Sequence, residues 1–219
     1  MRTLNILGLA VLATAAMAVC TGSASATTLT SPAGTTLKAG TELKASSEGA
    51  IQLHTVLGTR TCEYSNLMGE LANQGGAAET VSVALTNLSF NNCSPSFTFT
   101  VLSWGKMIIH TDTASADGNG IVTWSGTTFT TVAHTIVGDF HCKYHINETL
   151  AGTLTGSKNL EGSTATLALE SVELIPDKEY GWWYYCSEEE ENEKGERIEK
   201  GPVLTGSYTF ATPDYLDVD

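Results

Sequence analysis

The sequence is poor in charge, and above all in positive charge. Only 16% of its 219 residues are charged, and 11 Lys and Arg stand against 24 Asp and Glu, which gives a formal net charge of −13. A general nucleic-acid binder needs clustered Lys and Arg to neutralise phosphates, so this class is excluded. A hydrophobic fraction of 42% also excludes a disordered chain, because that much apolar surface supports a packed core.

Long apolar runs are equally scarce, and the one that is present lies near the N-terminus. It extends from Ile6 to Val19 behind the single positive charge of Arg2, and small residues follow it up to Ala26. This pattern is typical of a secretory signal peptide, so we predict that residues 1–26 are cleaved. The run is too short for a membrane-spanning helix, and no other segment reaches that length, so we predict a secreted protein without a membrane span.

Cysteine is rare too, with five residues in the chain. Cys20 lies at the end of the apolar run, where a lipid anchor is conceivable, but Val19 is not the small residue that lipid attachment requires before the cysteine. We therefore do not predict a lipoprotein. Signal cleavage removes Cys20, and an even number of cysteines in a secreted chain indicates a disulfide framework. The remaining four are Cys62, Cys93, Cys142 and Cys186.

Helical periodicity is missing, and alternation of apolar and polar residues takes its place. Alternation with β-branched and aromatic residues predicts half-buried strands, and Gly, Asn and Asp between them predict turns. We expect roughly twelve strands in a single all-β domain over residues 27–219, arranged as an antiparallel β-sandwich or barrel. A slip in the alternation near Asn87 suggests a β-bulge. The clearest runs are Ile51–Val56, Val81–Phe90, Phe97–Val101 and Ala165–Leu174.

The two halves of this domain resemble each other. Each contains Cys-x-Tyr, then Gly-x-Leu, then a long alternating run and a second cysteine, which is consistent with an internal duplication. The correspondence favours Cys62–Cys93 and Cys142–Cys186 among the three pairings that four cysteines allow.

Catalytic signatures are also lacking. The chain has no G-x-S-x-G elbow and no phosphate-binding glycine loop. His141 and His145 resemble a metal pair, but four residues apart on a strand they are about 13 Å apart, too far for one zinc ion. We therefore predict neither a metal site nor a cofactor, and we consider an enzyme the less favoured alternative. That alternative is a secreted hydrolase with a site dispersed over several strands, drawing on His54, His110 or His141.

Two acidic stretches could bind cations. Asp112 and the turn Asp117–Gly120 resemble a calcium loop but lack its alternating ligands, so we expect a hairpin turn there. The segment 187–201 contains seven acids and three bases between Glu188 and Lys200. We interpret it as a solvated, self-repelling hairpin loop, with calcium or a basic partner as its alternative ligands.

Aromatic residues make up only 8% of the chain, yet five of them gather in one segment of seven residues that ends at Cys186. If this segment is a strand, its rings point alternately to opposite faces, and one set is left for solvent or a ligand. Rows of exposed aromatic rings stack on sugars or contact proteins. The candidate binding residues are Tyr180, Trp182, Trp183, Tyr184 and Tyr185. Trp104 and Trp124 stand alone, and we expect both in the core.

Three stretches carry a resemblance to known proteins: Thr28–Gly34, the Cys62–Cys93 unit with Leu88-Ser-Phe90, and Gly152–Gly156. They resemble an uncharacterised group of secreted bacterial proteins that are rich in Thr and Gly, all-β, and contain paired cysteines. The resemblance implies a fold and a location but no activity. Because the chain lacks a catalytic signature and contains the aromatic segment, we expect a secreted or cell-surface, non-catalytic binding or structural module whose ligand is an extracellular glycan, a cell-wall polymer or a protein.

Overall fold

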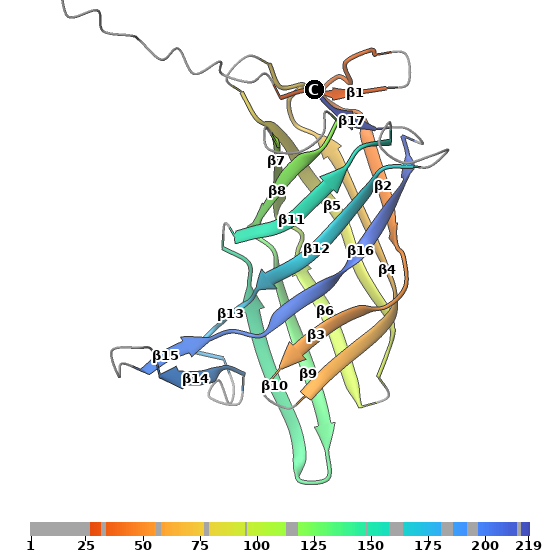
Figure 1. Ribbon diagram of the computed structural model, residues 1–219. Helices are drawn as coiled ribbons and strands as arrows, with labels where there is room; N and C mark the ends of the chain where they lie inside the picture. The colour runs from red at the N-terminus through yellow and green to blue at the C-terminus, as the bar shows by residue number, and fades with distance from the viewer. Residues whose placement is uncertain are drawn as a thin grey trace, which may run out of the picture.

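The computed structural model describes residues 27–31, 34–55, 58–76, 79–94, 96–112, 118–147, 149–157, 164–180, 186–191, 197–213 and 216–219. Within these ranges the chain is almost entirely β-strand, and every strand pairing is antiparallel, as expected (Figure 1). The strands are β1 (Leu29–Thr30), β2 (Glu42–Ser47), β3 (Ile51–Thr55), β4 (Gly58–Leu71), β5 (Val81–Cys93), β6 (Phe97–Ser103), β7 (Lys106–Thr111), β8 (Gly120–Ser125), β9 (Thr128–Thr135), β10 (Gly138–His145), β11 (Thr149–Thr155), β12 (Thr166–Glu173), β13 (Ile175–Pro176), β14 (Glu188–Glu191), β15 (Arg197–Lys200), β16 (Val203–Thr212) and β17 (Asp217–Val218).

The largest sheet closes on itself. Its order is β12-β11-β8-β7-β5-β4-β2-β16, and β12 also pairs with β16, which completes an eight-stranded barrel-like sheet. The consecutive strands β2 and β3 both lie between β4 and β16, because each of them pairs with these two strands. Of the two architectures expected, the structure therefore adopts the barrel, in which neighbours in the sheet follow one another along the chain.

A smaller sheet of four strands extends one end of this barrel. Its strand order is β13-β10-β9-β6 (Figure 1). Each of these strands is the direct chain neighbour of one barrel strand, and the barrel strands lie in the corresponding order β12-β11-β8-β7. Four long strands therefore change sheets part-way along their length. Counting these four and the β2–β3 pair as single interrupted strands reduces the seventeen described strands to twelve.

Glycines permit the change of sheet. Gly105 separates β6 from β7 with φ +72°, and a Cβ atom there would lie 2.2 Å from the carbonyl oxygen of Ser125. Next to it, the buried indole of Trp124 donates to Thr127 Oγ1 (2.7 Å), and the Thr127 hydroxyl donates to the carbonyl of Trp104.

Trp124 is in the core as predicted, but the prediction for Trp104 is wrong. Trp104 is 46% exposed, because it lies between β6 and β7, where the chain passes from one sheet to the other.

The bulge expected near Asn87 is confirmed. Met68 pairs with Asn87 and Gly69 with Leu85, so one extra residue, Thr86, bulges from β5. A Cβ atom on Gly69 would approach Val83 Cγ1 to 2.7 Å, so glycine suits the close approach of β4 to β5 at this point.

The core fills the barrel and continues between the two sheets. Inside the barrel, alternate residues of each strand are buried, among them Leu43, Leu67 and Val83. Below the barrel, aromatic rings fill the space between β5 and the four-stranded sheet. Phe99 lies 4.0 Å from Phe90 and 4.4 Å from Phe129 between ring centroids, and such contacts add to the stability gained from burial.

The two ends of the domain meet. Thr28 and Asp219 exchange two backbone hydrogen bonds as β1 pairs with β17, and Leu29 and Val218 are buried in this contact. The signal peptide predicted for residues 1–26 lies outside the described residues. None of the described segments is a helix long and apolar enough to cross a membrane.

The two halves that resemble each other in sequence are arranged differently. Cys62, Tyr64, Gly69 and Leu71 all lie on the single strand β4. Their counterparts are divided between β10 in the four-stranded sheet and β11 in the barrel-like sheet. The pairing of Gly-x-Leu with the following alternating strand is repeated, since Gly69 pairs with Leu85 and Gly152 with Leu169. The position of the second cysteine is not repeated, because Cys93 lies on β5 whereas Cys186 lies beyond β12 and β13.

Candidate functional site

The aromatic segment is described only at its start. Tyr180 is 36% exposed at the end of a turn after β13, whereas Trp182, Trp183, Tyr184 and Tyr185 lie outside the described residues. The proposed division of their rings between two faces stays a prediction. What the structure does describe is how the chain is held immediately before and after them.

Before the segment, a turn fastens the chain to Lys143 of β10. The Asp177 amide donates to the Lys143 carbonyl (2.8 Å), and the Asp177 carboxylate accepts a charged hydrogen bond from Lys143 Nζ at the same distance. The amides of Glu179 and Tyr180 bond back to Asp177, which closes the turn. Lys143 Nζ also lies 5.9 Å from the centre of the Tyr180 ring, within range of a cation–π contact.

After the segment, a disulfide fastens the chain to the adjacent residue of the same strand. Cys186 is bonded to Cys142, and both are buried. This is one of the two predicted pairs, and the other, Cys62–Cys93, is present as well. Residues 181–185 are thus bounded by two attachments that meet at Cys142 and Lys143.

The electrostatics of the first attachment favour its charged form. The hydrogen bond from Lys143 holds the pKa of the Asp177 carboxyl below its ordinary value, and the Glu179 amide acts in the same direction. The same bond to Asp177 raises the pKa of Lys143. The ion pair is therefore charged over the whole range between the ordinary pKa values of the two groups.

The acidic segment contains a strand pair that the sequence did not predict. β14 pairs with β15 in register, placing Glu188 opposite Lys200 and Glu191 opposite Arg197, while Glu189 meets Glu199. The hairpin loop expected for residues 187–201 therefore contains two short antiparallel strands. Residues 192–196 lie outside the described part of the chain.

The histidines of the hydrolase alternative are not brought together. His54 lies on β3, His110 on β7 and His141 on β10, and none of these strands pairs with another of the three. The imidazole of His54 bonds to the hydroxyls of Thr59 and Thr205, neither of which is an acid. Among the described residues, no three His, Cys, Asp or Glu side chains gather closely enough to hold a metal ion.

Sequence reasoning missed one histidine contact. His134 Nδ1 lies 2.8 Å from Asp139 Oδ1 across the β9–β10 hairpin, and the two residues are partners in the register. The alternation on both strands and the two-residue turn Ile136–Val137 between them were the signals that could have revealed it. As predicted, His141 and His145 share one face of a strand, and His134 lies on the same face of the neighbouring strand.

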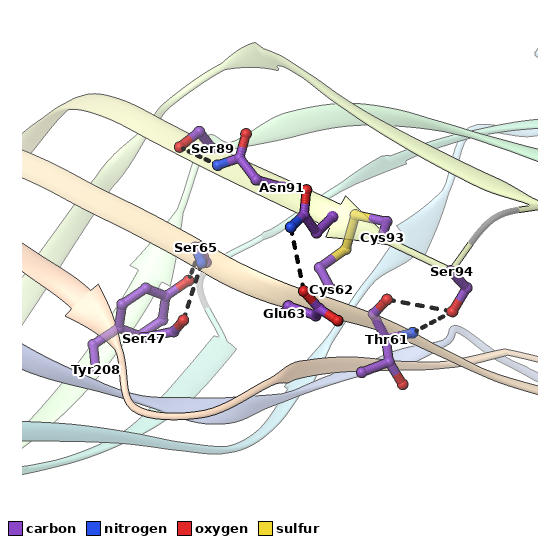
Figure 2. Close-up of a disulfide and its surroundings, with 11 residues drawn as sticks. Ser47, Thr61, Cys62, Glu63, Ser65, Ser89, Asn91, Cys93, Ser94 and Tyr208 are labelled. Atoms are coloured by element: carbon purple, nitrogen blue, oxygen red, sulfur yellow. Dashed lines mark hydrogen bonds between the residues drawn. A yellow bond between two sulfur atoms is a disulfide. The ribbon is translucent and has the colours of Figure 1, made fainter.

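The Cys62–Cys93 disulfide lies within the barrel-like sheet (Figure 2). Cys62 and Cys93 are direct partners in the β4–β5 ladder. Near them, the amide of Thr61 donates to Ser94 Oγ, and Asn92 donates to the carboxylate of Glu63. A shallow hollow of about 370 Å³ lies here, lined by Thr61, Glu63, Asn92, Cys93 and Ser94. None of these lining residues is a histidine, and the described start of the aromatic segment, Tyr180, follows β13 of the other sheet.

Comparison with known proteins finds no family model that matches the chain, no matching curated protein and no matching solved structure. The resemblance to secreted Thr- and Gly-rich proteins therefore stays a prediction, and the residues themselves must support any function.

Proposed function

We propose that this protein is a secreted or cell-surface, non-catalytic binding module that holds an extracellular glycan, cell-wall polymer or protein through the aromatic segment Tyr180–Tyr185. One observation carries the proposal: the chain on either side of this segment is attached to adjacent residues of β10, by the Lys143–Asp177 ion pair and by the Cys142–Cys186 disulfide. Fixed ends reduce the conformational entropy that a loop loses on binding, and preorganisation of this kind raises affinity.

The chemistry of the segment suits sugars and proteins alike. Trp and Tyr offer large, rigid, partly polar surfaces that stack on sugar rings and form the centres of protein interfaces. The hydrolase alternative has less support, since His54, His110 and His141 lie on strands that do not pair with one another.

Secretion is part of the same proposal. Two disulfides favour an oxidising compartment, where such bonds persist. Thr27, the residue that would follow signal cleavage, is buried and bonds to Gly76 and Thr111 at the end of the barrel. N-terminal sequencing of protein recovered from the culture medium should start at Thr27, and a start within residues 1–26 would contradict the proposed cleavage site.

The binding proposal is tested by screening the purified protein on glycans and cell-wall polymers. The variant Trp182→Ala/Trp183→Ala should lose most of the binding that the unmodified protein shows. Trp104→Ala is the matched control, because Trp104 is an exposed tryptophan at the junction of β6 and β7. Equal losses in both variants, or unchanged binding in the double variant, would rule out the aromatic segment. Release of reducing ends from a polymer would favour the hydrolase instead.

A further inference from the structure

The tip of the β9–β10 hairpin presents the most exposed large apolar side chains of the described residues. Ile136 is fully exposed, and Val137 is 79% exposed. The pairing of β6 with β9 ends at Ala133, so residues 134–139 extend the hairpin beyond the last described strand beside it. In Figure 1 this hairpin projects past the barrel and past the strands around it. We call Ile136 and Val137 the apolar tip.

The conformation of the turn does not depend on these two side chains. The Thr135 hydroxyl donates to the Gly138 carbonyl (2.8 Å), and the Val137 amide donates to Thr135 Oγ1 (3.3 Å). Gly138 has a φ of +129°, which favours glycine. Turn positions usually hold Gly, Asn, Asp, Ser or Pro, and an exposed aliphatic side chain buries nothing in the folded protein. A partner therefore explains Ile136 and Val137 better than folding does.

A second turn at the same end of the molecule has the same sequence pattern. Residues 55–58 read Thr-Val-Leu-Gly, and residues 135–138 read Thr-Ile-Val-Gly. In both turns the threonine hydroxyl donates to the glycine carbonyl at 2.8 Å. Thr55 lines a small cavity together with Ala133 and Phe140, which lie on the two strands directly behind the apolar tip. The aliphatic pair of the second turn lies outside the described residues, so the surface consists of the apolar tip alone.

A lipid bilayer suits the apolar tip better than a second protein does. A stable protein–protein interface buries roughly 1,000 Å² or more, and two aliphatic side chains supply far less. A bilayer requires no complementary surface, only projecting apolar groups and polar groups that are bonded within the inserted segment, as the Thr135 hydroxyl and the Val137 amide are. Residues 134–139 add three residues to each strand, about 10 Å of height, which matches the depth of the boundary between headgroups and acyl chains.

Charge decides which lipid surface fits the tip. The chain has a formal net charge of −13, and Asp139 lies two residues from Val137. The hairpin has one lysine, Lys143, which is bonded to Asp177. Recognition of anionic lipids requires clustered Lys and Arg close to the membrane, and this hairpin does not contain them. A zwitterionic surface without net charge therefore fits better than an anionic one.

We propose that the apolar tip inserts Ile136 and Val137 into a zwitterionic lipid bilayer and so attaches the protein reversibly to a membrane surface. The inference goes beyond the proposed function, because these residues are not part of the aromatic segment. Two aliphatic side chains make a weak anchor, since even one acyl chain gives only marginal, reversible binding. The attachment is therefore transient, and a second contact on the same surface would prolong it.

The test mixes the secreted protein with phosphatidylcholine vesicles and separates bound from free protein by flotation. We expect binding that rises with lipid up to about 5 mM and is unchanged in 0.5 M NaCl, because apolar insertion does not depend on unscreened charge. Ile136→Ser/Val137→Ser should weaken binding about tenfold or more, since it removes both inserted side chains. No binding of the unmodified protein at about 5 mM lipid, or unchanged binding of the variant, would overturn the proposal.

The matched control is Leu102→Ser/Leu150→Ser, which replaces two exposed aliphatic residues on β6 and β11. It should keep the binding of the unmodified protein, and equal losses in the two double variants would exclude the apolar tip as the binding surface. A polarity-sensitive dye on an introduced cysteine measures insertion itself. The dye should report an apolar environment on vesicles at Val137→Cys and not at Leu150→Cys. A response at both positions, or at neither, would contradict insertion of the tip.

Changes of lipid separate the alternatives further. Replacing half of the phosphatidylcholine by phosphatidylglycerol should weaken binding several-fold in low salt and much less in 0.5 M NaCl, because an anionic surface repels an acidic protein. Tighter binding to the anionic vesicles would overturn the choice of zwitterionic lipid. If Ile136→Ser/Val137→Ser instead converts a dimer in solution into a monomer, the partner of the tip is a second copy and the proposal is wrong.

Two variants distinguish membrane attachment from the proposed function. Trp182→Ala/Trp183→Ala should lose glycan or protein binding and keep vesicle binding, whereas Ile136→Ser/Val137→Ser should do the reverse. If the tryptophan variant loses vesicle binding and the tip variant keeps it, the aromatic segment contacts the bilayer and the inference is wrong. If no vesicle binding occurs while glycan binding is intact, membrane attachment is excluded and the proposed function stands.

Discussion

The two disulfides close loops of similar length but perform different tasks. Cys62–Cys93 spans 31 residues and joins strands that are already paired along β4 and β5, so it reinforces an existing ladder. Cys142–Cys186 spans 44 residues and joins β10 to the beginning of the segment that leads into β14. The first therefore stabilises a sheet, whereas the second attaches the chain that follows β13 to the neighbouring strand β10. A disulfide's contribution to stability and its contribution to function need not coincide.

The largest predicted effect is a loss of stability on removing a disulfide. It should be the same for both disulfides, because it arises from the entropy of the unfolded chain. Removing either bond, as Cys62→Ala/Cys93→Ala or Cys142→Ala/Cys186→Ala, should lower the free energy of unfolding by about 4 kcal/mol from chain entropy. Denaturant unfolding of the oxidised protein and both variants measures it. If one variant lost far less than the other, the shared entropic origin would be wrong.

Local behaviour should then separate the two sites. In Cys142→Ala/Cys186→Ala, amide exchange at Ser187 and along β14 should accelerate several-fold or more, and ligand binding should weaken about tenfold, because the segment loses an attachment. In Cys62→Ala/Cys93→Ala the amides of β4 and β5 stay in their ladder and should keep their relative protection. Hydrogen exchange of the folded proteins provides the measurement, and the opposite pattern would contradict the comparison.

A buried hydrogen bond on the barrel side provides a smaller effect. The Tyr208 hydroxyl lies 2.6 Å from Ser65 Oγ inside the barrel, near the first disulfide (Figure 2). Burial raises the pKa of this phenol far above its ordinary value, so it stays neutral. Tyr208→Phe leaves Ser65 without this partner and should cost about 1–2 kcal/mol in thermal or denaturant unfolding, without a change in ligand binding. A loss of ligand binding in Tyr208→Phe would contradict this prediction, because it would mean that the contact inside the barrel also affects the binding site.

The smallest effect on stability is expected at the ion pair of the second region. Asp177→Asn should change the free energy of unfolding only slightly, because solvent screens an exposed ion pair. Binding should fall several-fold, since the turn loses its charged bond to Lys143. Lys143→Gln serves as the complementary variant and should give a similar result.

The pH dependence of this pair has a definite sign. Because folding lowers the pKa of Asp177, its contribution is present above its ordinary pKa and is lost as the pH falls through the lower, folded value. Because folding raises the pKa of Lys143, its contribution is present below its ordinary pKa and is lost as the pH rises through the higher value. Exchange at the Tyr180 amide, which bonds to the Asp177 carbonyl, should therefore be slowest relative to intrinsic rates between about pH 4 and pH 10. A protection minimum inside that range would contradict the assignment.

Local patterns predicted much of the fold. The alternation from Val81 to Phe90 identified a strand with one buried face, and its slip near Asn87 located the bulge. Both disulfide pairs followed from the correspondence between the two halves of the chain. Trp104 was misplaced, because whether a single aromatic residue faces the core depends on where the chain changes sheets, and local alternation does not contain that information. The contact between His134 and Asp139 was missed because it depends on the register of the β9–β10 hairpin.

The sequence by itself determined that this chain is acidic, built of antiparallel strands and closed by two disulfides. These properties depend on composition and on the period-two pattern, which are local. Only the tertiary structure decided that the strands close into a barrel, that four of them continue into a second sheet, and that both ends of the aromatic segment meet on β10. The physical reason is that strand order, and the convergence of Lys143, Asp177, Cys142 and Cys186, depend on contacts between residues far apart in the chain.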